Sequence, residues 1–404
     1  MTGNTLPRLL RRAVAEIVVE NELVRLLEQG RPLRIKQGFD PSRPDLHLGH
    51  AVCLRKLRQF QELGHEVILV VGDWTARIGD PSGRAAPRVM LTPEEVQANA
   101  RTYMEQFFRV VNRERTRAVY QSEWYDRFTL ADVIYLSSKF TVARMLARED
   151  FASRFEQERP IGLVELLYPL LQAYDSVAVQ ADVEVGGTDQ RFNILLGRDL
   201  QAAVGQVPQQ AFLVPLLLGT DGAQKMSKAL GNHIGIAEPP GDMYGKLMSI
   251  PDQLIPQYYE LLTDMPDEEL EEIKQSLATR IAHPMDLKKR MAYEIVAQFH
   301  SPDAAREAAL EFERVFQRRE VPSEVSEVGL GPEWFGRQVH AADLVLAAGL
   351  ASSRSEARRL VLGGGVRLNG ERIGEAPVMV HEGALLQVGR RRFVRLVRRD
   401  GGAQ

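Results

Sequence analysis

"LRIKQGFDPSRPDLHLGHAVCLRKLRQFQELGHEVILVVG", residues 33–72, decides the fold. Residues 33–39 and 66–72 are short apolar runs, and residues 46–64 between them have helical periodicity. A strand, a helix and a second strand in that order predict a parallel sheet with helices on its faces, and such sheets bind ligands at the carboxyl ends of their strands. We therefore expect an α/β fold whose Rossmann-like domain, with an N-terminal helix, covers residues 1–242.

The rest of the chain predicts three further parts. Helical patterns continue over residues 91–111, 130–155 and 163–179 of the first domain. A helical bundle is expected over residues 243–320, with helix starts at Pro251, Pro266, Pro284 and Ser301. Residues 321–338 contain helix-breaking Pro and Gly and are expected to form a linker. Residues 339–404 predict a small α+β domain, with two short helices that lead into strands.

The composition is that of a water-soluble protein. Of the 404 residues 26% are charged, the net charge is -3, and no run approaches the roughly 20 apolar residues of a membrane span. The N-terminal residues lack the apolar core of a signal peptide. The single cysteine, Cys53, excludes an internal disulfide. We expect a cytoplasmic enzyme or binding protein without a membrane partner.

The near-neutral net charge hides an asymmetry. Residues 339–404 contain eleven arginines, no lysine and six acidic residues, a balance of +5, which leaves the preceding 338 residues at -8. In residues 390–399, "RRRFVRLVRR", apolar and basic residues alternate, so we expect these arginines to share one face of a strand. Such a module predicts an RNA partner, and a solvated basic surface is the alternative.

His47 and His50 lie at the start of the helix expected over residues 46–64, directly behind a proline-rich turn. Zinc sites on helices more often use histidines four apart with a glutamate between them, and a third ligand is not evident. A pair of packed histidines at a helix start is another interpretation. The free N–H groups of a helix start favour phosphate, and Gly49 removes a side chain where a ligand could approach the backbone.

A second polar segment is "GTDGAQKMSKALGNHI", residues 219–234. Lys225 and Lys228 flank Met226 and Ser227 in a loop bounded by glycines. Two lysines in a loop are ordinarily solvated surface. Together with a histidine-bearing helix start, they could close over a triphosphate.

Five motifs give a specific resemblance. "HLGH" (47–50) and "KMSKA" (225–229) resemble the HIGH and KMSKS signatures of class I aminoacyl-tRNA synthetases. "GDPSGR" (79–84), "YPLLQAYD" (168–175) and "GGTDQRFN" (186–193) resemble tyrosyl-tRNA synthetase. The resemblance runs from about residue 35 to the C-terminus, and it implies a tyrosine–tRNA ligase that forms tyrosyl-adenylate and then charges tRNA.

The resemblance also implies roles for individual residues. Tyr168, Gln172 and Asp175 share one helix face at i, i+4 and i+7. The first two would hold the ammonium group of tyrosine with Asp80, Asp175 would accept the phenol hydrogen bond, and Gln190 would contact the carboxyl region. The residues assigned to ATP are Asp40, Ser42, His47, Gly49, His50, Asp189, Lys225, Met226, Ser227 and Lys228, and those assigned to catalysis are His47, His50, Lys225 and Lys228.

The same resemblance implies the partners. L-tyrosine, ATP with accompanying magnesium and a tyrosine tRNA are expected, without a dedicated protein site for a metal or a tightly bound cofactor. "SRSEARRLVLGGGVRLNG" (353–370) resembles a small RNA-binding domain, in which Arg354, Arg358 and Arg359 would face RNA phosphates. Members of the family are homodimers, and we expect one here.

Two positions depart from the family pattern. Ala229 replaces a Ser or Thr in the lysine loop, so the loop would rely on Ser227. Lys36 occupies the position of a tyrosine that touches the substrate hydroxyl, which leaves open the residue that joins Asp175 there. With "GGTDQRFN", Lys36 indicates a second bacterial branch of the family.

Three other functions remain as alternatives. Tryptophanyl-tRNA synthetase shares the fold and both signatures, but an asparagine in place of His50 and no basic tail would be expected. An RNA-binding protein that resembles a synthetase but does not charge tRNA is kept open by Ala229. A metal-dependent hydrolase built on His47 and His50 is the least favoured.

Overall fold

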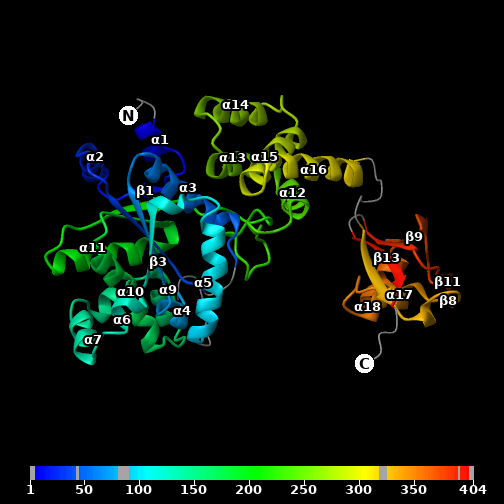
Figure 1. Cartoon of the computed structure of the whole chain (residues 1–404), viewed down its shortest axis with the longest axis horizontal. Coiled ribbons are helices and arrows are strands. Elements are labelled where there is room, and N and C mark those ends of the chain that lie inside the picture. The colour runs from blue at the N-terminus through cyan, green and yellow to red at the C-terminus, as the bar shows by residue number, and fades with distance from the viewer. Residues whose placement is uncertain (1–4, 42–44, 81–90, 318–324, 390–391, 400–404) are drawn as a thin grey trace. The chain divides into compact units, whose positions relative to one another are not determined.

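The computed structural model describes residues 5–41, 45–80, 91–317, 325–389 and 392–399. The chain forms two compact units, Met1–Ala305 and Arg306–Gln404. The first unit contains a six-stranded sheet, its helices and a following group of helices, and the second begins within the last of these helices and contains a smaller sheet with two helices (Figure 1). The predicted site residues therefore all fall in the first unit, except for the three arginines assigned to RNA.

The six-stranded sheet has the order β1-β6-β5-β2-β3-β4. Its strands are β1 Glu16–Ile17, β2 Arg34–Phe39, β3 Glu66–Val71, β4 Thr116–Tyr120, β5 Val183–Gly187 and β6 Gln210–Val214. The five strands from β6 to β4 pair in parallel, whereas the two-residue β1 pairs antiparallel with β6. The chain runs outward from β2 to β4 and then returns to β5, so the strand order reverses between β2 and β5. The predicted α/β fold is confirmed, and this reversal is where such sheets bind ligands.

Helices surround this sheet. Their bounds are α1 Thr5–Arg11, α2 Glu20–Glu28, α3 Leu48–Glu62, α4 Thr75–Ile78, α5 Pro93–Phe107, α6 Ser122–Tyr125, α7 Leu130–Ser137, α8 Val142–Leu146, α9 Glu149–Glu156, α10 Leu163–Val179 and α11 Arg191–Ala203. Helix α3 packs against β3 and β5, while α10 and α11 pack against each other and against β2, β5 and β6. The helical pattern over residues 130–155 is divided into three helices. The break has a local cause, because the Thr141 side chain accepts a hydrogen bond from the amide of Arg144 and so caps a new helix.

The helices that follow the sheet are α12 Pro240–Ser249, α13 Ile255–Leu262, α14 Asp267–Ala278, α15 Pro284–Phe299 and α16 Pro302–Phe312. The expected helix starts at Pro266, Pro284 and Ser301 agree with α14, α15 and α16. Pro251 precedes a 3₁₀ turn that leads into α13. Pro284 and Pro302 are the first residues of α15 and α16, a position that needs no N–H, whereas Pro266 and Pro251 directly precede their helices.

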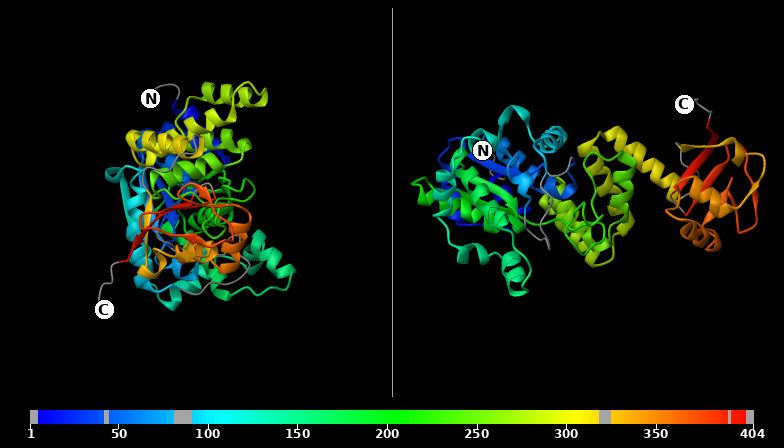
Figure 2. Two further views of the ribbon diagram at one scale, coloured as in Figure 1. Left: turned by 90° about the vertical axis from the view of Figure 1, so that its right-hand side faces the viewer. Right: turned by 90° about the horizontal axis from the view of Figure 1, so that it is seen from below.

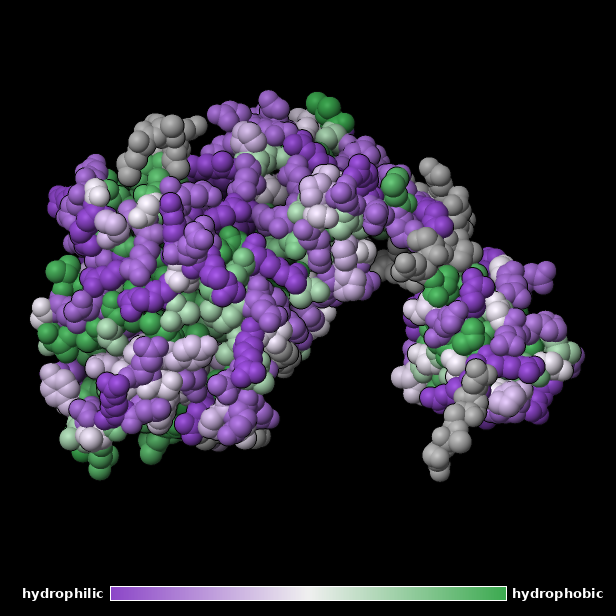
Figure 3. All heavy atoms as spheres, viewed as in Figure 1, coloured by the Kyte–Doolittle hydropathy of each residue, from purple (hydrophilic) through white to green (hydrophobic). Residues whose placement is uncertain are grey.

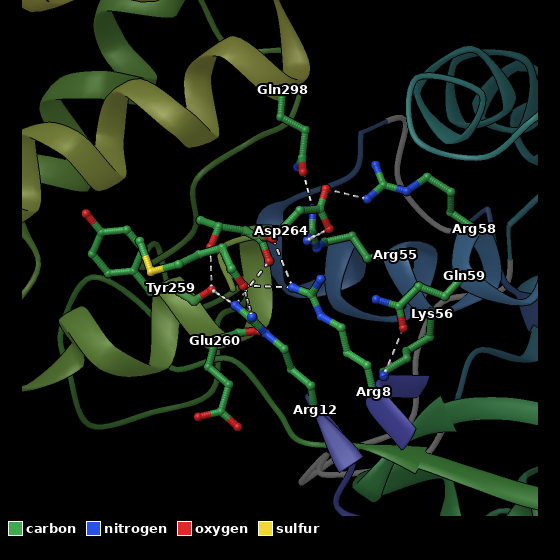
Figure 4. A network of polar contacts seen from close by, with 12 residues as sticks. Arg8, Arg12, Arg55, Lys56, Arg58, Gln59, Tyr259, Glu260, Asp264 and Gln298 are labelled. Carbon is green, nitrogen blue, oxygen red and sulfur yellow. Dashed lines mark hydrogen bonds and ion pairs between the residues drawn. The ribbon is translucent and has the colours of Figure 1, made fainter. Parts of the chain in front are cut away.

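Basic side chains join α3 to α13 and the N-terminal segment (Figure 4). Arg55 and Arg58 of α3 form ion pairs with Asp264 at 2.6 and 2.7 Å. Lys56 donates to the carbonyl oxygen of Leu9 at 2.9 Å. Arg12 donates to four carbonyl oxygens at and beyond the end of α13, those of Tyr259, Glu260, Thr263 and Met265. These contacts fix the C-terminal half of α3, whose first turn carries the two histidines.

The second unit is a two-layer α+β structure (Figure 1, Figure 2). Its elements are β7 Ser326–Leu330, β8 Gln338–Val339, α17 Ala341–Ala347, α18 Arg354–Leu362, β9 Val366–Leu368, β10 Glu371–Arg372, β11 Val378–Met379, β12 Leu385–Val388 and β13 Arg392–Arg398. Five strands form a sheet in the order β10-β9-β12-β13-β7, and β8 pairs with β11. The expected pair of helices leading into strands is confirmed.

Two expectations for this region need correction. Part of the expected linker forms β7, which pairs in parallel with β13 and so belongs to the sheet of the second unit. The other domain boundaries remain predictions. The arginines of β13 do not share one face: Arg392, Arg395 and Arg398 are three apart, and the period of two in a strand places Arg395 opposite the other two.

Candidate active site

A cavity of about 400 Å³ opens beyond the carboxyl ends of β2 and β5, where the strand order reverses. The start of α3, one face of α10 and the loop after β6 complete its wall. Every predicted tyrosine, ATP and catalytic residue within the described ranges lines it: Asp40, His47, Gly49, His50, Asp80, Tyr168, Gln172, Asp175, Asp189, Gln190, Lys225, Met226, Ser227 and Lys228. Ser42 lies outside the described residues. Residues almost two hundred positions apart in the chain thus share one cavity.

His47 and His50 form a reciprocal cap at the start of α3. The Nδ1 atom of His47 accepts a hydrogen bond from the amide of Gly49 at 3.2 Å, and the Nδ1 atom of His50 accepts one from the amide of His47 at 3.2 Å. Because a neutral imidazole carries its proton on the other nitrogen, both Nε2 atoms are N–H donors. A Cβ atom at Gly49 would lie 2.9 Å from His47 Nδ1, so the close cap itself requires glycine.

Both histidines are neutral near pH 7. Burial lowers the pKa of His50 to about 4, and burial together with the charge of His50 lowers that of His47 further. The two rings therefore offer hydrogen bonds rather than full positive charges. The packing interpretation and the phosphate interpretation are compatible, since Nδ1 holds the helix start and Nε2 remains for a ligand.

The lysine loop lies against the start of α3. Lys225 forms an ion pair with Asp189 at 2.8 Å, and Lys228 forms one with Asp45 at 2.9 Å. The amide of Met226 donates to the carbonyl oxygen of Leu217 at 2.8 Å, and this methionine is buried. Both lysines therefore have carboxylate partners in this structure.

The hydroxyl of Ser227 supports the loop at the position where Ala229 departs from the family. Ser227 Oγ accepts a hydrogen bond from the amide of Ala229 at 3.3 Å, and the Ser227 amide donates to Asn232 Oδ1 at 2.7 Å. The turn is thus held without a hydroxyl at residue 229, as expected for a loop that relies on Ser227.

One part of the cavity gathers polar groups suited to an ammonium ion. The hydroxyl of Tyr168 donates to Asp40 at 2.8 Å. Asp80 accepts a hydrogen bond from Gln190 Nε2 at 2.8 Å and lies 3.3 Å from the guanidinium of Arg148. Carboxylates and oxygen acceptors in this arrangement favour a cationic group of a ligand.

Gln172 lies beside this group and is held through its side-chain oxygen. Asn193 Nδ2 donates to Gln172 Oε1 at 2.9 Å, and Asn193 in turn accepts a hydrogen bond from Arg148 at 3.2 Å. Arg148 and Asn193 therefore orient Gln172 and Asp80 from behind, although neither was predicted from the sequence.

Asp175 of α10 lies at the buried end of the cavity with 2% of its surface exposed. Its carboxylate accepts hydrogen bonds from Gln121 Nε2 at 2.7 Å and from the hydroxyl of Tyr125 at 3.3 Å. Burial raises the pKa of Asp175 to about 7, against the opposing effect of the Lys36 charge. A buried carboxylate with such a pKa is a strong acceptor for a hydroxyl group.

Gln121 has a fixed orientation. Its Oε1 atom accepts hydrogen bonds from the amides of Thr75 and Trp74, at 2.9 and 3.3 Å, and from the Thr75 hydroxyl at 3.0 Å. Since oxygen must face these donors, Nε2 faces Asp175. One N–H of this group bonds Asp175, and the side chain lines the cavity.

Lys36 lies behind the cavity wall rather than in it. The side chain is fully buried, and Nζ forms an ion pair with Glu184 at 3.0 Å and donates to Ser176 Oγ at 2.7 Å. Glu184 and Ser176 are also buried. Lys36 is therefore not the residue that joins Asp175 at a substrate hydroxyl.

Several functional residues were missed because their partners come from distant segments. Gln121, for example, directly follows β4, and the rule that ligands bind at the carboxyl ends of strands would have singled it out. Asn193 ends the "GGTDQRFN" motif but was given no role, and Asp45, Arg148 and Glu184 carry no comparable signal in the sequence.

The three arginines assigned to RNA share α18. Arg354 forms an ion pair with Asp343 at 2.8 Å and Arg358 forms one with Glu375 at 2.8 Å. All three guanidinium groups are on exposed residues, but two of them have their charge balanced within the domain. Their RNA role remains a prediction.

Among the described residues, no group of three or more His, Cys, Asp or Glu side chains is placed to hold a metal ion. No helix in the described ranges combines the length and apolar character needed to cross a bilayer.

Comparisons with known proteins agree with this geometry. A family model for class I tRNA synthetases (W and Y) matches residues 28–317, and a model of the S4 domain matches residues 342–386. The tyrosine–tRNA ligase of Dehalococcoides mccartyi (strain CBDB1) is 53% identical over 394 residues, covering 98% of this chain and 99% of that protein. That of Thermotoga maritima is 51% identical over 398 residues, with 98% of each chain covered.

A solved structure extends the agreement to the fold. The tyrosyl-tRNA synthetase of Archaeoglobus fulgidus, complexed with L-tyrosine, matches with a TM-score of 0.62 and 26% identity, covering 75% of this chain and 98% of that chain. Family model, relatives and fold point to one group, so the chain belongs to the bacterial tyrosyl-tRNA synthetase family of class I aminoacyl-tRNA synthetases.

Proposed function

We propose that this chain is a tyrosine–tRNA ligase that activates L-tyrosine with ATP and transfers it to the terminal ribose of a tyrosine tRNA. The observation that carries the proposal is a single cavity with a buried carboxylate, Asp175, at one end and two imidazole donors and two lysines at the other. The names of the relatives favour tyrosine over tryptophan.

The first step is attack by the tyrosine carboxylate on the α-phosphate of ATP, with release of pyrophosphate. The nucleophile is ionised at neutral pH, so no general base is required. Catalysis then rests on positioning and on stabilising the charge that builds on phosphoryl oxygens. His47 and His50 supply neutral N–H donors for this charge, and Lys225 and Lys228 supply positive charge.

In this proposal the lysines change partners when ATP binds. The triphosphate displaces Asp45 from Lys228, while Asp189, released from Lys225, becomes free to accept hydrogen bonds from the ribose. Both ion pairs are partly exposed, and such pairs exchange at little cost in free energy. Magnesium would accompany ATP as part of the substrate and would neutralise phosphate charge.

Tyrosine selection occurs at the buried end. The phenol O–H donates to Asp175, and the phenol oxygen accepts the second N–H of Gln121. Phenylalanine would leave each group without its hydrogen bond to the substrate in a buried site, which costs far more than a lost methylene; a tyrosyl-tRNA synthetase is the standard example of this asymmetry. At the other end of the amino acid, Tyr168, Gln172 and Asp80 bind the ammonium group and Gln190 contacts the carboxyl region.

The second step brings in tRNA, which α18 of the S4 domain contacts through Arg354, Arg358 and Arg359. A cytoplasmic site of action follows from the supply of tRNA and ATP there. The protein that binds RNA without charging it is disfavoured, because all described residues assigned to ATP and tyrosine line one cavity.

A homodimer is part of the proposal. Helices α7, α8 and the first turn of α10 carry exposed apolar side chains, namely those of Leu130, Ile134, Tyr135, Val142, Leu163 and Val164. Figure 3 shows hydrophobic side chains exposed at the lower left of the first unit. Several large exposed apolar side chains on neighbouring helices favour a protein interface. Sedimentation equilibrium should give twice the mass of 45.4 kDa.

Exchange of labelled pyrophosphate into ATP tests the central claim. Tyrosine should promote the exchange, and phenylalanine and tryptophan should not. Exchange promoted by another amino acid, or by none, would refute the proposed ligase.

A further inference from the structure

The five-stranded sheet of the S4 unit has two unlike faces. Its inner face packs against α17 and α18 through apolar residues of the core: Val366, Leu368, Leu386, Val388, Val394 and Leu396. The residues between them point to the opposite face, since neighbours in a strand alternate. Within the described residues, no helix covers that second face.

The strand register defines what this outer face carries. Arg372 pairs with Arg367, Arg367 with Gln387, and Gln387 with Phe393, so these four residues form one row across β10, β9, β12 and β13. Neighbouring strands are about 4.8 Å apart, which gives the row a length of about 14 Å. Arg395 follows Phe393 on the same face, two residues along β13.

The arginines of this face are not neutralised. Arg367, Arg372 and Arg395 are exposed, and none forms an ion pair with a described residue. Arg354 and Arg358 of α18, in contrast, each have a carboxylate partner at 2.8 Å. Glu327 of β7 is the register neighbour of Arg395 but makes no ion pair with it. The outer face thus has more uncompensated positive charge than the helix face assigned from the sequence.

Phe393 adds an aromatic ring to the basic row. It is not part of the hydrophobic core of the S4 unit, and its side chain is half-buried, with Gln387 as its register neighbour. A ring on the open face of a sheet is a platform on which an unpaired base can stack, and arginines beside it can bind the adjoining phosphates. An acidic protein partner could form ion pairs with the arginines, but it would have no need of the aromatic ring.

We propose that the outer face of this sheet, formed by Arg367, Arg372, Gln387, Phe393 and Arg395, binds a segment of RNA with unpaired bases. Phe393 stacks on a base, and the arginines hold phosphates. The inference rests on the proposed function only in taking that RNA to be the tRNA of the reaction. It adds a second contact surface to α18, on the other side of the domain core.

The test measures the Kd of full-length protein for tyrosine tRNA over a range of salt concentrations, without tyrosine or ATP. In Arg367→Gln/Arg395→Gln the Kd should rise, and the slope of log Kd against log salt should fall by about one per arginine. The matched control is Arg398→Gln. Arg398 is on the same strand, but it faces the other way and lies 3.5 Å from Glu382. It should leave the slope unchanged.

Phe393 is tested by two substitutions. Phe393→Leu keeps an apolar side chain but removes the ring, and the Kd should rise about fivefold at every salt concentration with an unchanged slope. Phe393→Tyr keeps the ring and should bind as the unchanged protein does, which separates stacking from a loss of folding.

Two results would overturn the inference. One is an unchanged Kd and slope in the double arginine variant, and the other is an equal loss in Arg398→Gln. Pyrophosphate exchange by the same variants should stay at the level of the unchanged protein. Failure of that exchange in the unchanged protein would instead count against the proposed function, since RNA binding is measured without the reaction.

Discussion

The two ends of the cavity use charged residues in opposite ways: the end proposed to bind ATP, here called the phosphate end, and the end proposed to bind the tyrosine hydroxyl, here called the phenol end. At the phosphate end, Lys225 and Lys228 form ion pairs in which the side chains are 15–48% exposed. At the phenol end, Lys36 and Glu184 form an ion pair in which the side chains are 0% and 2% exposed. Exposed pairs contribute little stability and exchange readily, whereas a buried pair that loses one partner leaves an uncompensated charge. The phosphate end can therefore rearrange on binding, and the phenol end is fixed before tyrosine arrives.

The largest expected effect is a loss of stability when the buried ion pair at the phenol end is broken. Lys36→Met leaves the buried Glu184 carboxylate without its partner and should lower the free energy of unfolding by about 3–5 kcal/mol. Lys225→Met, the matched change at the phosphate end, should alter it by less than about 0.5 kcal/mol. Urea denaturation followed by circular dichroism measures both.

A second variant tests whether the lost stability comes from the unpaired charge of Glu184 or from a general disturbance of the fold. Lys36→Met/Glu184→Gln removes both charges and should recover much of the lost stability. The contrast between the ends fails if Lys36→Met costs no more than Lys225→Met.

The next largest effect is a slower reaction when a lysine of the phosphate end is replaced. Lys225→Met and Lys228→Met should each slow tyrosyl-adenylate formation about 10²–10³-fold, as does loss of one preorganised donor in other enzymes. Affinity for tyrosine should not change, because the lysines lie at the other end of the cavity. Single-turnover rates and the tyrosine dependence of exchange separate the two. A loss limited to tyrosine affinity would remove the lysines from catalysis.

A smaller effect sharpens the description of the phenol end. Gln121→Met keeps the volume but removes the donor, so discrimination between tyrosine and phenylalanine should fall about tenfold or more. The control is Tyr125→Phe, at a residue that does not line the cavity; its hydroxyl donates to the carbonyl oxygen of Leu171 at 2.6 Å and lies 3.3 Å from Asp175. The ratio of kcat/KM values for the two amino acids is the measurement, and equal losses in both variants would contradict a direct role for Gln121.

The smallest effect is a pH dependence confined to the phenol end. The pKa of Asp175 is raised to about 7, so its charged acceptor form is present above that pH and is lost as the pH falls. The kcat/KM for tyrosine should therefore drop about tenfold from pH 8 to pH 6. His50, with a pKa lowered to about 4, should add no inflection there. Asp175→Asn should abolish the dependence, and its persistence would assign the titration to another group.

The candidate site was predictable where local chemistry and position coincide. His47 and His50 open a helix behind a strand, and Tyr168, Gln172 and Asp175 share a helix face, so sequence spacing alone brought each group together. Lys36 shows the opposite case. The resemblance placed it where a tyrosine would touch the substrate hydroxyl and left open which residue joins Asp175, and its side chain bonds Ser176, 140 residues away, behind the cavity wall.

The sequence by itself determined the strand–helix–strand unit, the helix starts at proline and the signature residues of the site, because periodicity and capping are properties of neighbouring residues. Only the tertiary structure decided the partners of those residues. It placed Gln121 on Asp175, paired both loop lysines with carboxylates and turned Arg395 of β13 away from Arg392 and Arg398. These outcomes depend on which distant segments pack together and on the partner that each buried charge then needs. Neighbouring residues in the sequence specify neither.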